Sequence, residues 1–354
     1  MNKMKEEIET PRGNSEWMIT VARRQQRTIE EAERILEDVL QMGISSVDIE
    51  YREEICYDIE GLDGYYSPGI LRDFRHFFSL LYYANNPKMY PNLVAHVSYL
   101  LVVVGQIKEF LKLRIEGAEL DITSMVESHI GFWWKNINLL EYKMYEKGAE
   151  IIQLSFNSTK DTEKMTFTDK GYWFNLKTGK IHYVCKIRPA KVVRFIKGND
   201  TEPEVVKPKL MFVYPGEINS RIRWKEAKKR KVKSSDIKTL LGNAETDYAV
   251  VVNRMKESFK DPLAEPTPAV LIKLHKAFIN GGHLVLEDGQ GGLLTVMDLP
   301  EDNAPTSELL RAILPANPEG YALLVEVNED IQSNLFSVKP LSIITSNRII
   351  RLLY

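Results

Sequence analysis

Cysteine is scarce in this sequence of 354 residues. Its two cysteines, Cys56 and Cys185, lie far apart along the chain. A disulfide framework needs more cysteines, and so does a zinc site of the Cys₄ or Cys₂His₂ kind built from local pairs. We therefore expect a reducing, cytoplasmic compartment and no bound metal.

Long apolar runs are also missing. Residues 1–17 contain no apolar core of the kind that signal peptides have. The longest apolar run, Leu93–Val104, is interrupted by His96 and Ser98. About 20 apolar residues are needed to span a bilayer, so this run is too short. We expect it to form a buried helix of a helical core, and we expect no membrane partner.

Recognisable catalytic and cofactor motifs are absent. No histidine lies in a His-Glu-x-x-His sequence, and His182 and Cys185 point to opposite faces of a predicted strand. Gly64–Gly69 has one residue too many for a nucleophile elbow, and Asp288–Gly292 lacks the Lys-Ser/Thr of a P-loop. We predict no cofactor and favour a non-enzymatic function. An enzyme whose site is assembled from residues distant in sequence stays an open alternative.

An acidic segment, Asp48–Asp63, has seven carboxylates. Paired carboxylates can bind Mg²⁺ or act as acid and base. The Asp-x-Asp-x-Asp-Gly frame of an EF-hand is missing, however. We interpret the segment as a solvated acidic loop.

Charge is strongly segregated along the chain, although the formal net charge is only -2. Residues 147–240 contain 22 Lys and Arg against 10 Asp and Glu, so this third carries +12 and the remainder -14. Aromatic residues are interleaved with these cations, and such regions bind acidic or polyanionic partners. A basic face that is merely solvated is the alternative.

The basic excess peaks in Ser220–Ser234, which we call the basic segment. Arg and Trp are enriched at binding hot spots, so this segment is the best candidate for a contact surface. Its candidate contact residues are Arg221, Arg223, Trp224, Lys225, Lys228, Lys229, Arg230, Lys231 and Lys233.

The periodicity of apolar residues predicts an α+β protein in three parts. Residues 1–146 have helical spacing and predict a helical domain, with helices that include 28–42, 68–84, 91–116 and 122–145. We expect Gly43 to end the first helix and Pro68 to lie in the first turn of the second. Thr28 is either the cap of the first helix or lies inside a longer one that also includes residues 17–21. Residues 147–260 predict a basic antiparallel β-region with trailing helices, and residues 269–354 predict a small mixed α/β domain. Within these parts we expect a hairpin turn at 177–180, a strand at 192–196, a loop at 199–208 and helices at 235–260 and 269–279.

These observations favour a cytoplasmic scaffold or accessory subunit that binds an acidic protein partner through its basic central region. The alternative is a nucleic-acid-binding protein that uses the same region, because aromatic residues on an open sheet can stack unpaired bases.

Overall fold

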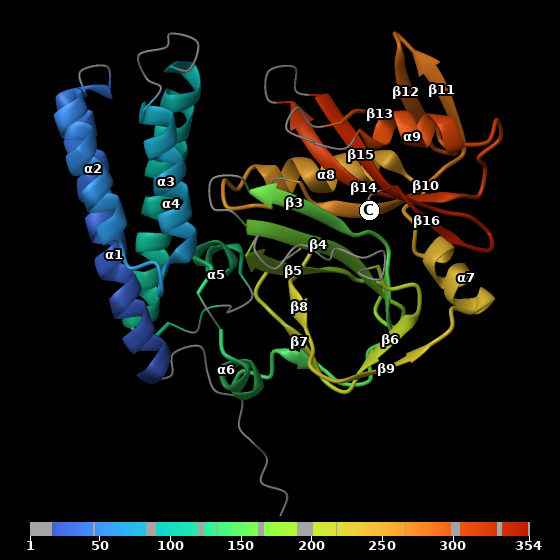
Figure 1. Cartoon of the computed structure of the whole chain (residues 1–354), viewed down its shortest axis with the longest axis horizontal. Helices are drawn as coiled ribbons and strands as arrows, with labels where there is room; N and C mark the ends of the chain where they lie inside the picture. The colour runs from blue at the N-terminus through green and yellow to red at the C-terminus, as the bar shows by residue number, and fades with distance from the viewer. Residues whose placement is uncertain are drawn as a thin grey trace, which may run out of the picture. The chain divides into compact units, whose positions relative to one another are not determined.

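The computed structural model describes residues 16–352, except 45–46, 83–89, 119, 121–123, 133, 162–165, 190–200, 217, 266, 299–304 and 331–334. Its contacts define two compact units: residues 1–144 with 214–217, and residues 145–213 with 218–354. Helices form the first unit, and antiparallel and mixed sheets dominate the second (Figure 1). The predicted α+β class is therefore confirmed.

The first unit consists of four longer helices followed by two short ones. They are α1 (Glu16–Met42), α2 (Ile49–Gly61), α3 (Pro68–Tyr82), α4 (Tyr90–Ile115), α5 (Met125–Ile130) and α6 (Asn136–Glu141). In α1, Thr28 lies within the helix rather than at its start, and Gly43 follows the last turn with a φ of 83°. Glycine accepts this left-handed conformation without the penalty that a Cβ imposes.

The acidic segment is a helix, so the predicted loop is wrong. Asp48 is the N-cap of α2, and its side chain accepts a hydrogen bond from the Tyr51 amide. An acidic residue at this position satisfies a free amide and interacts favourably with the helix dipole. The segment therefore contributes a capped helix to this unit, with Ile55 and Ile59 buried.

The predicted helix over 122–145 is also wrong. Gly131 ends α5 with a φ of 71°, and α6 begins only at Asn136. Close packing fixes the position of α5, because an added Cβ at Gly69 in α3 would lie 1.7 Å from the carbonyl oxygen of His129. The His129 ring is held as well, since its Nε2 lies 2.7 Å from Oδ2 of Asp73.

Helix α4 is long and apolar enough to cross a membrane by length and composition alone. Core helices of other proteins pass the same test. One face of α4 is buried, including Leu93, Leu100 and Ile107. The apolar run 93–104 thus contributes its buried face to the helical core, whereas Val102 on another face is 50% exposed.

The second unit begins with a six-stranded sheet in which β5 pairs with β4 and the other strands have the order β3-β4-β2-β6-β9. Its strands are β2 (Ile151–Gln153), β3 (Asn157–Asp161), β4 (Thr166–Asn175), β5 (Ile181–Pro189), β6 (Val205–Pro208) and β9 (Ala227–Arg230). A smaller sheet joins β1 (Tyr145–Glu146), β7 (Met211–Val213) and β8 (Ile222–Arg223). The predicted turn at 177–180 joins β4 to β5, which is confirmed.

A seven-stranded sheet follows, with the order β10-β14-β15-β13-β12-β11 and β16 paired to β15. Its strands are β10 (Ala269–Lys273), β11 (Lys276–Asn280), β12 (His283–Glu287), β13 (Leu293–Val296), β14 (Ala322–Asp330), β15 (Leu335–Ile344) and β16 (Ile349–Arg351). The helices of this unit are α7 (Ser234–Gly242), α8 (Tyr248–Phe259) and α9 (Thr306–Ile313).

Two expectations for this unit are wrong. Residues 269–279 form β10 and β11 instead of a helix, because both strands are paired within the second sheet. Residues 205–208 of the expected loop form β6. The trailing helices expected over 235–260 are confirmed as α7 and α8. The expected strand at 192–196 lies outside the described residues.

One apolar core joins the two large sheets. Ile152, Tyr172 and Phe174 from the first sheet pack in the same cluster as Leu271 and Leu324 from the second. Helix α7 contributes Ile237 and Leu240 to this cluster. The contacts therefore group the predicted second and third parts of the chain in one compact unit.

Candidate tryptophan pocket on the first sheet

The first sheet has one face in the core that it shares with the second sheet. On its other face, Ile151, Trp173 and Val206 pack with Met211 and Ile222 of the smaller sheet, and polar side chains lie beside this cluster. Strand side chains alternate between faces, so Asp169, Gly171 and Trp173 lie opposite the face that buries Tyr172 and Phe174. Their neighbours on β5 are Lys186, Val184 and His182, respectively. The second face is thus a row of mixed charged, small and aromatic residues.

This face contains a pocket of about 470 Å³, which we call the tryptophan pocket. That size lies within the range of small-ligand sites, roughly 300–1,000 Å³. Strands β2, β4 and β5 supply six of its lining residues, and the connection between β2 and β3 supplies Phe156. The other three come from β8 and the two residues after it. The lining residues are Gln153, Phe156, Asp169, Gly171, Trp173, Val184, Lys186, Arg223, Trp224 and Lys225.

Two tryptophans pack against each other in this pocket. The rings of Trp173 and Trp224 meet edge to face, with centroids 5.1 Å apart and an interplanar angle of 78°. Trp173 is 5% exposed, whereas Trp224 is partly exposed. Trp173 therefore acts as a rigid wall, and Trp224 offers a ring surface that a ligand can cover.

The segment that carries Trp224 is fixed by hydrogen bonds and burial. The amide of Tyr183 donates to the carbonyl of Ser220, and Ile222 is 1% exposed. Asn219 donates through Nδ2 to the carbonyls of Ile181 and Ala269 at 3.3 and 3.1 Å. This anchoring aims Arg223, Trp224 and Lys225 at the pocket, as a preorganised binding site requires.

The charged groups of the pocket differ in burial and in whether they have a partner of opposite charge. Asp169 is buried, and its Oδ1 accepts hydrogen bonds from Ser158 Oγ and Arg188 Nη2, each at 2.7 Å. Arg223, Lys225 and Lys186 are exposed, and no carboxylate lies within ion-pair distance of them among the described residues. The accessible charge of this site is therefore positive.

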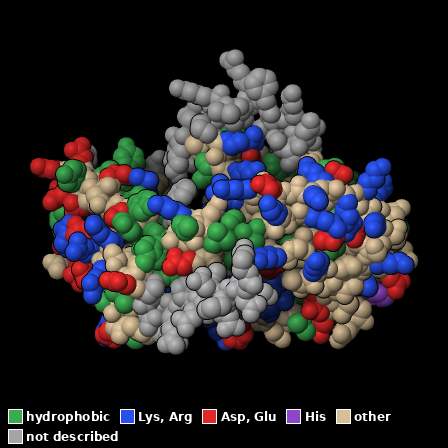
Figure 2. Space-filling model, turned by 90° about the horizontal axis from the view of Figure 1, so that it is seen from below, with side chains coloured by type: hydrophobic (Ala, Val, Ile, Leu, Met, Phe, Trp, Pro, Cys, Tyr) green, Lys and Arg blue, Asp and Glu red, His purple; other side chains and the backbone are tan. Residues whose placement is uncertain are grey.

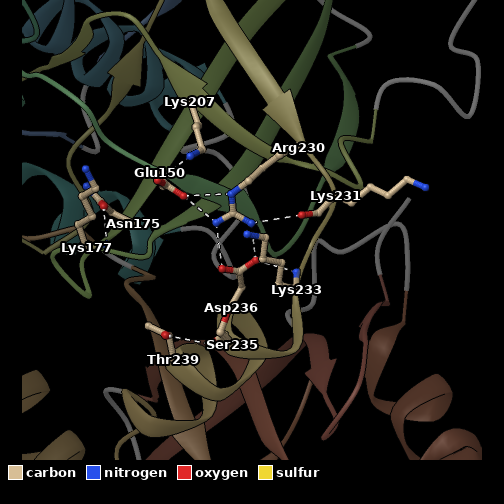
Figure 3. A network of polar contacts seen from close by, with 10 residues as sticks. All are labelled: Glu150, Asn175, Lys177, Lys207, Arg230, Lys231, Lys233, Ser235, Asp236 and Thr239. Atoms are coloured by element: carbon tan, nitrogen blue, oxygen red, sulfur yellow. Dashed lines mark hydrogen bonds and ion pairs between the residues drawn. The ribbon is translucent and has the colours of Figure 1, made fainter.

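Other residues of the basic segment serve the fold. Figure 3 shows Arg230 between two carboxylates. Its guanidinium bonds Glu150 Oε2 at 2.6 and 3.1 Å and both oxygens of Asp236 at 2.6 and 3.0 Å. Lys207 adds an ion pair to Glu150 at 2.8 Å. This network fastens β9 and β6 to the start of α7.

The carboxylates of this network stay ionised because of these contacts. Hydrogen bonds from Lys207 and Arg230 lower the pKa of Glu150. The hydrogen bond from Arg230 and the amide of Lys233 lower the pKa of Asp236, although its burial opposes this. Burial of both charges without such partners would cost several kcal/mol.

The remaining cations of the segment differ in whether they form an ion pair. Lys229 forms an ion pair with Glu202. Lys228, Lys231 and Lys233 are exposed, and their side chains form no ion pair among the described residues. In Figure 2, blue Lys and Arg side chains on the right-hand part of the molecule stand beside red Asp and Glu side chains. The face of the molecule drawn in Figure 2 is therefore mixed in sign rather than uniformly basic.

The described histidines, cysteines and carboxylates do not favour a metal site. Among the described residues, no three His, Cys, Asp or Glu side chains are grouped so as to hold a metal ion. Burial lowers the pKa of His182 to about 4, so its ring is neutral near pH 7. Cys185 pairs across the sheet with Lys170 and thus lies on the opposite face from His182, as the alternation predicts.

Comparisons with known proteins give no family. No family model matches the chain. No curated protein matches it. Among solved structures, a murine DNA binding protein bound with ds DNA aligns at a TM-score of 0.25 and 10% identity, over 58% of this chain and 96% of that one. A TM-score this low does not establish a common fold.

The structure therefore brings together Arg223, Trp224 and Lys225 from the predicted contact residues. It adds lining residues that the sequence reasoning missed, namely Gln153, Asp169 and Gly171. One signal pointed to two of them: in the Asp169-x-Gly171-x-Trp173 pattern, a charge and a glycine share a face with an aromatic ring. Gln153 follows two buried isoleucines and gives no such signal.

Proposed function

We propose that this protein is a non-enzymatic binding protein whose tryptophan pocket holds an acidic segment of a protein partner. The observation that supports this most is the combination of Trp224 with Arg223 and Lys225 on one anchored segment. Tryptophan and arginine dominate binding energy when they sit at a preformed pocket. Exposed cations around such a pocket attract carboxylates and raise the association rate.

The size and charge of the site favour a peptide segment. A pocket of about 470 Å³ accommodates one large side chain or a short stretch of backbone. Three exposed cations suit a ligand with two or three carboxylates near an apolar anchor. The ion pairs of Arg230 remove one cation of the basic segment from any nucleic-acid contact, which favours a short acidic ligand over a long polyanion.

Single-stranded nucleic acid is the second candidate. It is favoured by the same ring surface of Trp224 and by Phe156, because bases stack on aromatic side chains beside cations. Such a ligand would depend on salt through the release of counterions. We also propose a cytoplasmic setting, which two free cysteines support.

The test compares two fluorescent probes at about 50 mM salt, where charge contacts are strongest. One is an acidic peptide with a central phenylalanine, and the other is an oligothymidylate of similar charge. We expect the peptide to bind more tightly. Changing both Arg223 and Lys225 to Ser should weaken it by about tenfold or more, since each lost hot-spot contact costs more than about 1 kcal/mol.

The matched control changes Lys228 and Lys231 to Ser. These lysines belong to the same segment and are exposed, but they do not line the pocket. The control should bind the peptide within about twofold of the unmodified protein, since rim charges contribute little. Tighter binding of the oligonucleotide would replace the proposal by its alternative. Equal loss in both double variants would show that the pocket has no special role.

A further inference from the structure

Strand β11 ends the seven-stranded sheet with an open edge. It pairs with β12, and among the described residues no strand pairs with its outer side. Four of its five residues are exposed, with Phe278 at 38% and Ile279 at 46%. Figure 1 shows the β11–β12 hairpin extending beyond the rest of the sheet. An exposed apolar edge of this kind is a template for pairing with another strand.

The opposite edge of the same sheet is covered. The amide of Glu245 donates to the carbonyl of Leu271, and the amide of Lys273 donates to the carbonyl of Glu245, each at 2.8 Å. Backbone from outside the sheet thus satisfies the edge strand β10. Natural sheets usually cover or charge their edges to prevent association. The contrast between the two edges identifies β11 as the edge left open for a partner.

The turn of the hairpin determines which backbone groups of β11 are free. Asn280 pairs with His283 across Gly281 and Gly282, whose φ values are 57° and 86°. A two-residue turn of this type makes the flanking pair a hydrogen-bonded one. Because such pairs alternate along an antiparallel ladder, the amides and carbonyls of Ala277 and Ile279 point to the open edge.

We propose that β11 pairs with β11 of a second copy of this chain, antiparallel and with the two-fold axis at Phe278. In this register Ala277 faces Ile279 of the partner subunit on both sides of the axis. The free amides and carbonyls of these residues then form four hydrogen bonds. The two Phe278 side chains meet directly at the axis, and directly opposed aromatic pairs stabilise antiparallel strand pairing.

The charges of the strand fit a second copy. Lys276 lies opposite Asn280 of the partner subunit, so no like charges face each other across the new ladder. Each Lys276 keeps its own counterion, since its Nζ lies 3.3 Å from Glu287 Oε1. A symmetric dimer needs such a self-complementary surface. The interface of two short strands is small, so we expect a weak, concentration-dependent dimer.

Disulfide cross-linking tests the register. The background replaces Cys56 by Ser and Cys185 by Ala, which removes the two free thiols. With Phe278→Cys, the two new thiols face each other at a Cα separation near 4.5 Å, within the range for a disulfide. With Ile279→Cys, the two thiols are diagonal neighbours about 7–8 Å apart. We expect Phe278→Cys to form a covalent dimer at least tenfold faster under a mild oxidant.

Analytical ultracentrifugation tests the association itself. A small interface gives a weak dimer, so the measurement needs a protein concentration of roughly 0.1 mM. At this concentration the average mass should rise from 40.8 kDa towards twice that value. Ala277→Pro removes an outward amide without removing one from the hairpin ladder, so this variant should stay monomeric. Ile279→Lys should do the same by placing a charge on the edge.

A monomeric mass for the unmodified protein at this concentration would overturn the proposal. Equal cross-linking rates for the two cysteine variants would also overturn it, because they would indicate random collision or another contact. A dimer that persists in both Ala277→Pro and Ile279→Lys would place the interface elsewhere. The melting temperatures of the variants show whether each has kept its fold.

Discussion

Replacing Arg230 by Met should destabilise the second unit, although the composition of its segment predicts a basic contact surface. The side chain of Arg230 is 21% exposed, that of Glu150 is 22% exposed, and that of Asp236 is 8% exposed. Loss of one partner from a fully buried pair costs about 3–5 kcal/mol, whereas an exposed pair contributes at most about 1 kcal/mol. Because the exposure is intermediate, we expect a loss of about 2 kcal/mol in the free energy of unfolding.

The loss should be visible in thermal unfolding. For a unit of about 200 residues, 1 kcal/mol corresponds to roughly 2–4 °C, so the melting temperature should fall by about 4–8 °C. Lys228→Met is the matched control on the same strand. Lys228 is exposed and unpaired among the described residues, so its loss should change the free energy of unfolding by less than about 0.5 kcal/mol.

The dependence on pH gives a second check. The pKa values of Glu150 and Asp236 lie below their ordinary values because of their hydrogen bonds to Lys207 and Arg230. A carboxylate with a lowered pKa stabilises the folded chain above its unfolded pKa, and this contribution is lost as the pH falls through the folded pKa. The difference between the unmodified protein and Arg230→Met should therefore be full at pH 7 and shrink below about pH 4. Equal melting temperatures for Arg230→Met and Lys228→Met at pH 7 would refute this reasoning.

Further predictions concern helix packing and capping. Gly69→Ala should destabilise the helical unit by about 2–3 kcal/mol, because its Cβ would meet the His129 carbonyl at 1.7 Å. Gly105→Ala should instead be neutral or stabilise by up to about 1 kcal/mol, because no atom lies within 4 Å and alanine favours helix. Circular dichroism during urea unfolding measures both, and equal effects would contradict the packing argument. Asp298→Ala should cost about 1–2 kcal/mol, because Asp298 accepts the amides of Thr306 and Ser307 at the start of α9. A change below about 0.3 kcal/mol in its denaturant midpoint would contradict that role.

Local signals in the sequence predicted much of the fold. Pro68 at the start of α3, Gly43 after α1 and the turn at 177–180 each depend on a few neighbouring residues, and all three are confirmed. Residues 269–279 show the opposite case. They combine Val, Ile and Leu at a spacing compatible with a helix. They form strands because β10 pairs with β14 and β11 pairs with β12.

The site was predictable only in part, for a physical reason. Composition pointed to the basic segment, and three of its residues line the tryptophan pocket. Composition does not tell a free cation from a paired one. Arg230 meets Glu150 from 80 residues away, and such a contact is fixed by the packing of β9 beside β6. The same holds for Trp173, which meets Trp224 only after β4 and the segment after β8 have folded together.

Fluorine NMR of the protein labelled with 5-fluorotryptophan tests the proposed binding site most directly. The chain has five tryptophans, and substitution of each by Phe assigns its resonance. On titration with the acidic phenylalanine-containing peptide, the account predicts a saturable shift of the Trp224 resonance and a smaller one of Trp173. The resonances of the helical unit, including Trp17 and Trp134, should stay within the line width. Saturable shifts confined to the helical unit, or no shift at Trp224 when the peptide is bound, would contradict the central claim.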